Sequence, residues 1–110
     1  MKKLHVPYNL DLKVLDLYQE WSNSIEDIYF PIPPSIFTSA RELNFPPDYN
    51  DHVQTILHFC KQYQIRSALL VNGNRDDLTD QIFFQLTDYL NWIVPLGLDV
   101  IVVANPYLIH

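Results

Sequence analysis

The sequence is poor in cysteine and glycine. Its one cysteine, Cys60, cannot form an intramolecular disulfide or supply a cysteine-based zinc or iron–sulfur site by itself. Its two glycines, Gly73 and Gly97, are too few for a phosphate-binding loop, and the first expected strand-to-helix turn contains none. This shortage argues against a nucleotide-binding α/β domain, because a glycine-rich turn is what lets the backbone approach a pyrophosphate. We therefore expect no cofactor.

Basic residues are also scarce, and no long apolar run is present. Seven lysines and arginines stand against 13 acidic residues, which gives a net charge of −6. Such a surface repels the phosphate backbone, so we expect no nucleic acid partner. Asp11, Lys13 and Asp16 interrupt the region after the amino terminus, so we expect neither a secretory signal nor a membrane-spanning helix. Together with the lone cysteine, these features indicate a soluble cytoplasmic protein without membrane contact.

The spacing of apolar residues predicts alternating strands and helices in the order βαβαβαβ. The expected strands cover residues 4–8, 25–32, 65–71 and 100–104. The three expected helices begin near Val14, near Asn50 or Asp51, and near Asp76 or Asp77, and the apolar stripe of the second includes Cys60 and Gln64. Pro95 and Gly97 should end the third helix. The fourth strand is continuously β-branched, which predicts burial on both faces and therefore a parallel sheet.

One connection is unusually long. Residues 31–50 contain five prolines, whereas connections in α/β units usually have about 2–6 residues. This segment is either a functional loop or an element that the pattern does not reveal. A short helix over Ser35–Leu43 would reduce its irregular part.

Several short motifs resemble the peptidase U32 family. They are the opening Val6-Pro7-Tyr8-Asn9, the strand from Ile25 to Tyr29, and the segment from Leu98 to Leu108. The resemblance implies the start of a TIM-like (β/α) barrel, in a family of collagenase-type peptidases and of proteins that support oxygen-independent hydroxylation of RNA or quinone precursors. The later cysteine-rich region of that family, which holds an iron–sulfur cluster in its hydroxylation branch, has no counterpart here. A complete barrel takes about 200–250 residues, so residues 1–110 are expected to form a single truncated domain, half of a TIM-like (β/α) barrel.

A half-barrel has a physical consequence for partners. Right-handed crossovers would place all three helices on one face of the parallel sheet and leave the other face open. We therefore expect either a homo-oligomer or a larger partner enzyme. The alternative is that residues 31–50 and the chain ends fold over the open face. Trp21 and Trp92 are compatible with an interface, but their helical spacing favours a place in the core.

Candidate ligand-binding residues follow the strands. Three of the four expected strands end near asparagine, and the side chains concerned are Asn9, Asn72, Asn74, Asn105 and the nearby Tyr107. Sites in α/β proteins collect at the carboxyl ends of strands, and amides both donate and accept hydrogen bonds, so converging asparagines could hold a peptide backbone. The alternative is structural, since asparagine also favours turns and helix caps.

No catalytic or metal constellation stands out. His52, His58 and Cys60 have spacings that do not bring ligands together on one helix face, and the position of Cys60 on an apolar stripe predicts burial. The favoured function is therefore a non-catalytic accessory or binding protein that docks to a partner enzyme, for example a peptide-modifying enzyme, or to a peptide. The alternative is the N-terminal fragment of a U32-type peptidase or hydroxylation protein whose active residues lie beyond the chain.

Overall fold

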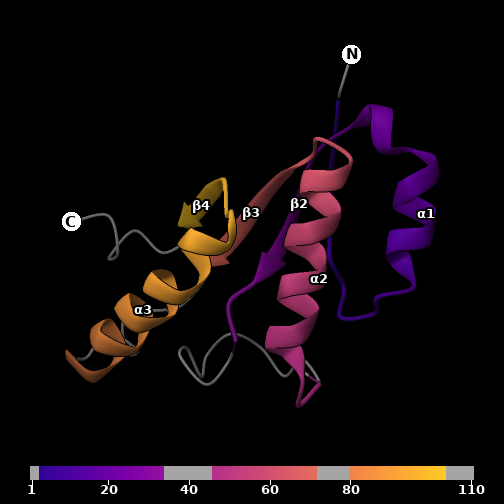
Figure 1. The fold of residues 1–110 in the computed structure, drawn as a ribbon. Coiled ribbons are helices and arrows are strands. Elements are labelled where there is room, and N and C mark those ends of the chain that lie inside the picture. The colour runs from indigo at the N-terminus through magenta and orange to yellow at the C-terminus, as the bar shows by residue number, and fades with distance from the viewer. Residues whose placement is uncertain (1–2, 34–45, 72–79, 104–110) are drawn as a thin grey trace.

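The computed structural model describes residues 3–33, 46–71 and 80–103, and shows an α/β fold built on a four-stranded parallel sheet. The strands lie side by side in chain order, β1-β2-β3-β4 (Figure 1). The strands are β1 (Leu4–Pro7), β2 (Ile25–Pro31), β3 (Arg66–Val71) and β4 (Val100–Val103). The helices are α1 (Val14–Glu20), α2 (Tyr49–Gln62) and α3 (Asp80–Ile93), with short 3-10 turns η1 (Ser22–Ser24) and η3 (Val94–Leu96).

The predicted alternation of strands and helices is confirmed, with small shifts at the boundaries. Gln64, expected on the stripe of the second helix, follows the end of α2 and has a φ of 56°. The third helix ends as expected, since η3 contains Pro95 and Gly97 closes it with a left-handed φ of 108°. The expected caps Asp76 and Asp77, and the possible helix over Ser35–Leu43, lie outside the described residues.

The core lies between the helices and one face of the sheet. Because side chains alternate along a strand, Ile28 and Phe30 of β2 share this face, and Leu69 of β3 joins them through its pairing with Phe30. The side of α2 that packs on the sheet contributes Val53, Ile56, Leu57 and Cys60, all buried. Each large apolar side chain that is fully buried in this way contributes roughly 1.5–3 kcal/mol. The predicted burial of Cys60 is confirmed.

Two predictions about burial are wrong. The fourth strand was expected to be covered on both faces, yet Ile101 and Val102 are 42% and 41% exposed. The reason is that β4 is an edge strand, with β3 as its one neighbour in the described sheet. Trp21 was expected in the core and is 56% exposed, because it lies past the last turn of α1. Trp92, in contrast, is half-buried and packs against the core cluster.

The backbone carbonyls of the prolines that end β1 and β2 accept hydrogen bonds from α1 and α2. Tyr18 of α1 donates a hydrogen bond to the carbonyl of Pro7, at 2.6 Å, and Tyr49 of α2 donates one to the carbonyl of Pro31, at 2.5 Å. Each bond ties a helix to the carboxyl end of the strand that precedes it. In the described part of the chain, no helix is both long and apolar enough to cross a membrane.

Hydrogen bonds between Asp99 and Ser67 hold the start of β4 against β3. The Asp99 carboxylate accepts hydrogen bonds from the backbone N–H of Ser67, at 3.0 Å, and from its hydroxyl, at 3.3 Å. The backbone N–H of Asp99 lies 3.1 Å from the same hydroxyl oxygen. Ser67 is 1% exposed, so these bonds satisfy polar groups that would otherwise be buried without partners.

Replacing Asp99 should therefore destabilise the fold. We expect Asp99→Ala to lower the free energy of unfolding by about 1–3 kcal/mol, because it leaves the Ser67 N–H buried and unpaired. Urea unfolding followed by circular dichroism measures the change. Glu20→Ala, which removes an exposed carboxylate from the end of α1, is the control and should change stability by about 0.5 kcal/mol or less. Equal effects of the two substitutions would show that the Asp99–Ser67 hydrogen bonds contribute nothing to the free energy of unfolding.

Candidate functional site

The structure does not bring the sequence-predicted ligand residues together. Asn9 is exposed immediately after β1. Asn72, Asn74, Asn105 and Tyr107 lie outside the described residues. Their convergence at the carboxyl ends of the strands stays a prediction.

Three tyrosines that the sequence analysis passed over are buried on the helix side of the sheet. Tyr8 follows β1, Tyr49 begins α2 and Tyr89 belongs to α3, and their exposed fractions are 2%, 4% and 9%. Burial raises the pKa of Tyr49, and the nearby Tyr8 and Tyr89 raise it further. All three phenols are protonated at neutral pH, so each can donate a hydrogen bond.

Tyr8 ends a short chain of polar groups. Its hydroxyl lies 2.6 Å from Nδ1 of His52, and Nε2 of His52 lies 3.3 Å from the carboxylate of Asp48. Burial raises the pKa of Tyr8 to about 12, and the charges of Asp11 and Asp48 add to the effect. The imidazole of His52 therefore lies between the Tyr8 hydroxyl and the Asp48 carboxylate, within hydrogen-bond distance of both.

This arrangement has the order of a catalytic triad but not its chemistry. In a triad the terminal hydroxyl is accessible and the imidazole removes its proton during attack. Here Tyr8 is buried and its raised pKa opposes deprotonation at neutral pH. The Tyr8–His52–Asp48 chain therefore joins the end of β1 to the start of α2. The i, i+4 spacing of Asp48 and His52 was visible in the sequence, but no sequence pattern indicated the partner 44 residues away.

The remaining titratable groups form no reactive cluster. Burial raises the pKa of the Cys60 thiol to about 12, with smaller contributions from the charges of Asp99 and Asp27. At neutral pH such a thiol is almost entirely protonated, so very little of the nucleophilic thiolate is present. Within residues 3–33, 46–71 and 80–103, no group of three histidine, cysteine, aspartate or glutamate side chains could hold a metal ion.

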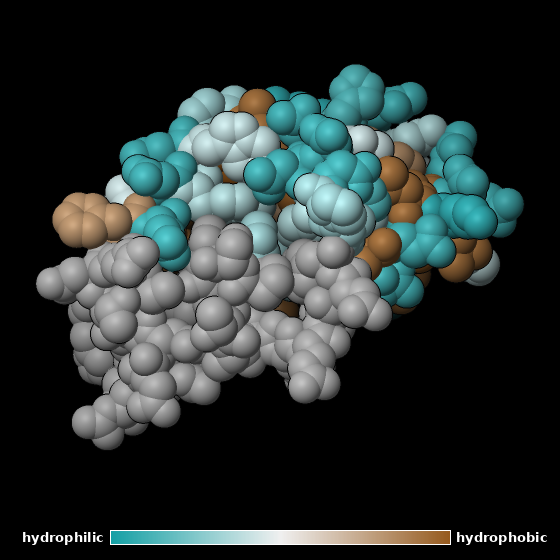
Figure 2. Space-filling model, turned by 90° about the horizontal axis from the view of Figure 1, so that it is seen from below, coloured by the Kyte–Doolittle hydropathy of each residue, from teal (hydrophilic) through white to brown (hydrophobic). Residues whose placement is uncertain are grey.

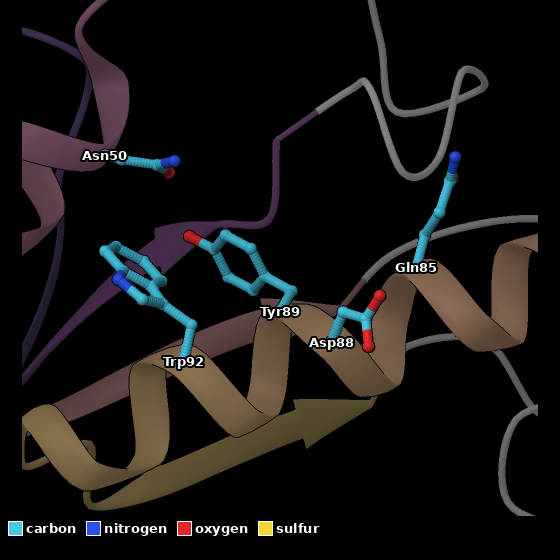
Figure 3. Close-up of a pocket in the computed structure, with 5 residues that line it drawn as sticks. All are labelled: Asn50, Gln85, Asp88, Tyr89 and Trp92. Carbon is cyan, nitrogen blue, oxygen red and sulfur yellow. The ribbon is translucent and has the colours of Figure 1, made fainter.

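A pocket lies between α2 and α3. The described residues that line this α2–α3 pocket are Asn50, Gln85, Asp88, Tyr89 and Trp92. Its volume is about 330 Å³. Tyr89 and Trp92 project from α3 toward Asn50 of α2, whereas Gln85 projects from α3 farther along the helix, away from Asn50 (Figure 3). The rings of Tyr89 and Trp92 pack against each other with their centroids 5.4 Å apart.

A second hollow occupies the face of the sheet opposite the core. All of its described lining residues belong to the four strands: His5, Asp27, Tyr29, Ala68, Leu70, Val100 and Val102. Its volume is about 300 Å³, and most of its lining is apolar. No helix residue of the described chain takes part, so this open sheet face is the side that α1, α2 and α3 leave uncovered.

Charged side chains gather where the strands of the open sheet face begin. His5 lies 2.8 Å from the carboxylate of Asp27 and 3.6 Å from that of Glu26, which also lies 3.9 Å from Arg66. These pairs are partly exposed, so they contribute little stability.

The opposite end of the molecule, toward which the strands of Figure 1 run, is shown in Figure 2. Hydrophilic residues cover most of the described surface there, and hydrophobic residues gather toward the α1 end.

No family model matches the chain, and neither a curated protein nor a solved structure shows significant similarity to it. The α/β class therefore comes from the sheet and helices themselves. A function must be argued from the surfaces described above.

The structural role of the Tyr8–His52 contact can be measured with a double-mutant cycle. We expect His52→Leu to cost about 1–3 kcal/mol, because the Tyr8 hydroxyl loses its hydrogen-bond partner inside the protein. Tyr8→Phe combined with His52→Leu should cost less than the sum of the single changes, with a coupling of about 1 kcal/mol in urea unfolding. His58, exposed on the same helix, gives the control pair Tyr8→Phe with His58→Leu, whose effects should add. Additive effects in both cycles would contradict the contact.

The thiol of Cys60 should resist alkylation. With its pKa raised to about 12, the thiolate fraction at pH 8 falls about a thousandfold, so we expect iodoacetamide to label the folded chain at least that much more slowly than the chain in urea. Mass spectrometry over a time course measures the rates. The double variant Cys60→Ala/Gln62→Cys moves the thiol to an exposed position at the end of α2 and should react quickly in both conditions. Rapid labelling of the folded wild type would contradict the buried position.

Proposed function

We propose that this chain is a non-catalytic accessory protein whose open sheet face docks onto a partner enzyme. The observation that carries the proposal is the hollow of about 300 Å³ whose described lining residues all belong to strands. Parallel sheets are normally covered on both faces, since their strands are apolar on both. A partner that covers this face would supply the layer that the chain's own helices do not.

The sheet edges support the same proposal. β1 and β4 each have one neighbour in the described sheet, so both present backbone groups on their outer sides. Leu4 and Val102 on these strands are 43% and 41% exposed. Four parallel strands in sequential order are also how half of a (β/α) barrel is arranged. In the proposal the chain resembles the N-terminal half of a U32-type barrel, and the partner extends its sheet.

Charge favours a partner enzyme over a second copy. Each chain carries a net charge of −6, so two copies repel each other at long range, whereas a neutral or basic surface is not repelled. The rim of the open sheet face carries both basic and acidic side chains, with Arg66 beside Glu26 and His5 beside Asp27. We place the partner among peptide-modifying enzymes, because the resemblance is to a peptidase family while the buried Tyr8 and Cys60 supply no nucleophile.

A second candidate function is the first half of a U32-type enzyme whose active residues belong to a further part of the same polypeptide. Ile101 favours it. This residue pairs with Leu69 and so faces the helix layer, yet it is 42% exposed. In a (β/α) barrel the helix that follows the fourth strand would cover such a side chain.

Docking can be tested by measuring mass in solution. The purified chain is examined by light scattering, alone and then mixed with candidate enzymes encoded beside it. We expect a stable mixed complex that Val102→Asp weakens at least about tenfold, because a charge would be buried in an apolar interface. Leu17→Asp is the matched control, since Leu17 is equally apolar and 53% exposed but lies on α1.

The state of the uncovered face gives an independent readout. The dye ANS, which fluoresces on exposed apolar surface, should bind the free chain, and both Val102→Asp and the partner should reduce its signal. A homodimer that Val102→Asp dissociates would replace the partner enzyme with a second copy. A cooperatively folding monomer that binds neither dye nor candidate enzymes would overturn the docking proposal.

A further inference from the structure

β4 is exposed on both of its faces at consecutive residues. Val102 lines the hollow of the open sheet face and is 41% exposed. Ile101 pairs with Leu69, so its side chain lies on the helix side, and it is 42% exposed. A partner layered on the open sheet face would cover Val102 but not Ile101. A segment lying along the outer edge of β4 would contact both side chains at once.

The outer edge of β4 consists of backbone groups. The N–H of Asp99 donates to the carbonyl of Ser67, which sets the ladder between β3 and β4. In a parallel ladder, successive residues direct their N–H and C=O groups to alternate sides, so those of Ile101 face β3. The backbone groups of Val100 and Val102 therefore face outward. Among the described residues no strand lies on that side of β4 (Figure 1).

A row of such backbone groups specifies the chemistry of its partner. Regularly spaced N–H donors and C=O acceptors are paired by the backbone of another extended segment, as in strand addition to an open sheet edge. The main-chain hydrogen bonds supply affinity, and the side chains on alternate faces supply specificity. An added strand at β4 needs apolar side chains on both of its faces, one beside Ile101 and the next beside Val102.

β1, the other edge strand, is less suited to pairing. The N–H of Tyr8 donates to the carbonyl of Tyr29 in β2, so the backbone groups of the preceding Pro7 face outward. Pro7 has no N–H, and its carbonyl already accepts the hydrogen bond from Tyr18. Proline on the outer side is one way in which edge strands are protected from pairing. The sequence of β4 contains no proline, so strand addition is favoured at β4.

We propose that the partner enzyme docks by adding an extended apolar strand, without acidic residues, to the outer edge of β4. The strand pairs with the backbone of Val100 and Val102 and places side chains beside Ile101 and Val102. The source of the strand rests on the proposed docking function, whereas the edge and the type of contact go beyond it. The net charge of −6 on each chain disfavours a second copy as the source.

Hydrogen exchange of single backbone amides, followed by NMR, tests the edge directly. In the free chain we expect the N–H of Val102 to exchange faster than the N–H of Ile101, which faces β3. The probe is the basic peptide acetyl-Lys-Thr-Val-Ile-Val-Thr-Lys-amide. At millimolar concentration it should slow exchange of the Val102 N–H at least about tenfold. The control peptide has proline in place of the central isoleucine and should have no effect, because it cannot complete the ladder.

Two substitutions at position 102 separate the backbone from the side chain. Val102→Pro removes the outward N–H and none of the groups that face β3, and an edge strand tolerates proline at such a position. We expect it to abolish binding of the probe peptide, measured by exchange of the Val100 N–H. Val102→Thr keeps the N–H and the shape of the side chain and should retain binding within about threefold, since its hydroxyl can stay solvated at the edge. Exchange in the wild-type chain needs no substitution, so it decides the question even where Val102→Pro fails to fold.

The same measurement on the complex with the partner enzyme separates strand addition from docking in general. Slower exchange of the Val102 N–H in the complex supports strand addition. A complex that Val102→Asp weakens, but in which this N–H exchanges as in the free chain, would overturn strand addition and leave docking on the open sheet face in place. Slowing by the probe peptide without any mixed complex would keep the edge as a strand-binding site and overturn the enzyme as its source.

Three further results would contradict the proposal. The first is a Val102 N–H that is as protected as that of Ile101 in the free chain, which would show that the edge is already paired. The second is no slowing by the probe peptide, or equal slowing by the proline peptide. The third is protection that rises with the concentration of the chain alone, which would replace the partner's strand with that of a second copy.

Discussion

The sequential order of the parallel strands is the constraint on which the rest of the structure depends. When each strand pairs with the next one in the chain, right-handed crossovers bring every connecting helix to the same face of the sheet. That face then contains the core, with Phe30 and Leu69 buried under α2. On the opposite face, where Tyr29, Leu70 and Val102 lie, no helix residue of the described ranges lines the hollow. The open sheet face follows from topology rather than from any unusual residue.

The sequence was sufficient to predict the elements, because apolar spacing differs between helices and strands. It also predicted burial of Cys60, which lies on a stripe with Val53 and Ile56. It failed where burial depends on neighbours distant in the chain. A β-branched run such as that of β4 has the same local pattern in a central strand and at an edge, so the exposure of Ile101 could not be read from it. The U32 resemblance predicted a half-barrel, and the parallel order agrees with that proposal without deciding it.

The candidate sites were less predictable than the fold, because each depends on contacts across the chain. In the sequence, His52 stands close to His58 and Cys60, whereas its contact in the structure is with Tyr8, 44 residues away. The tyrosines make the point most clearly. Tyr8, Tyr49 and Tyr89 are all buried, but the hydroxyl of the first lies beside an imidazole, that of the second donates to a strand carbonyl, and that of the third has no hydrogen-bond partner among the described residues. Residue type and helical position do not distinguish these three cases, since the acceptor comes from another element.

Hydrogen bonds from two helix tyrosines to the carbonyls at the ends of β1 and β2 explain how the open sheet face and the helix layer can act independently. The carbonyls of Pro7 and Pro31 hold Tyr18 of α1 and Tyr49 of α2, so these helices are fixed to the sheet by bonds on the core side. A partner on the open sheet face would contact the other side of the same strands and would not need to disturb these bonds. The α2–α3 pocket, built on the helix layer, would keep its geometry in the docked state.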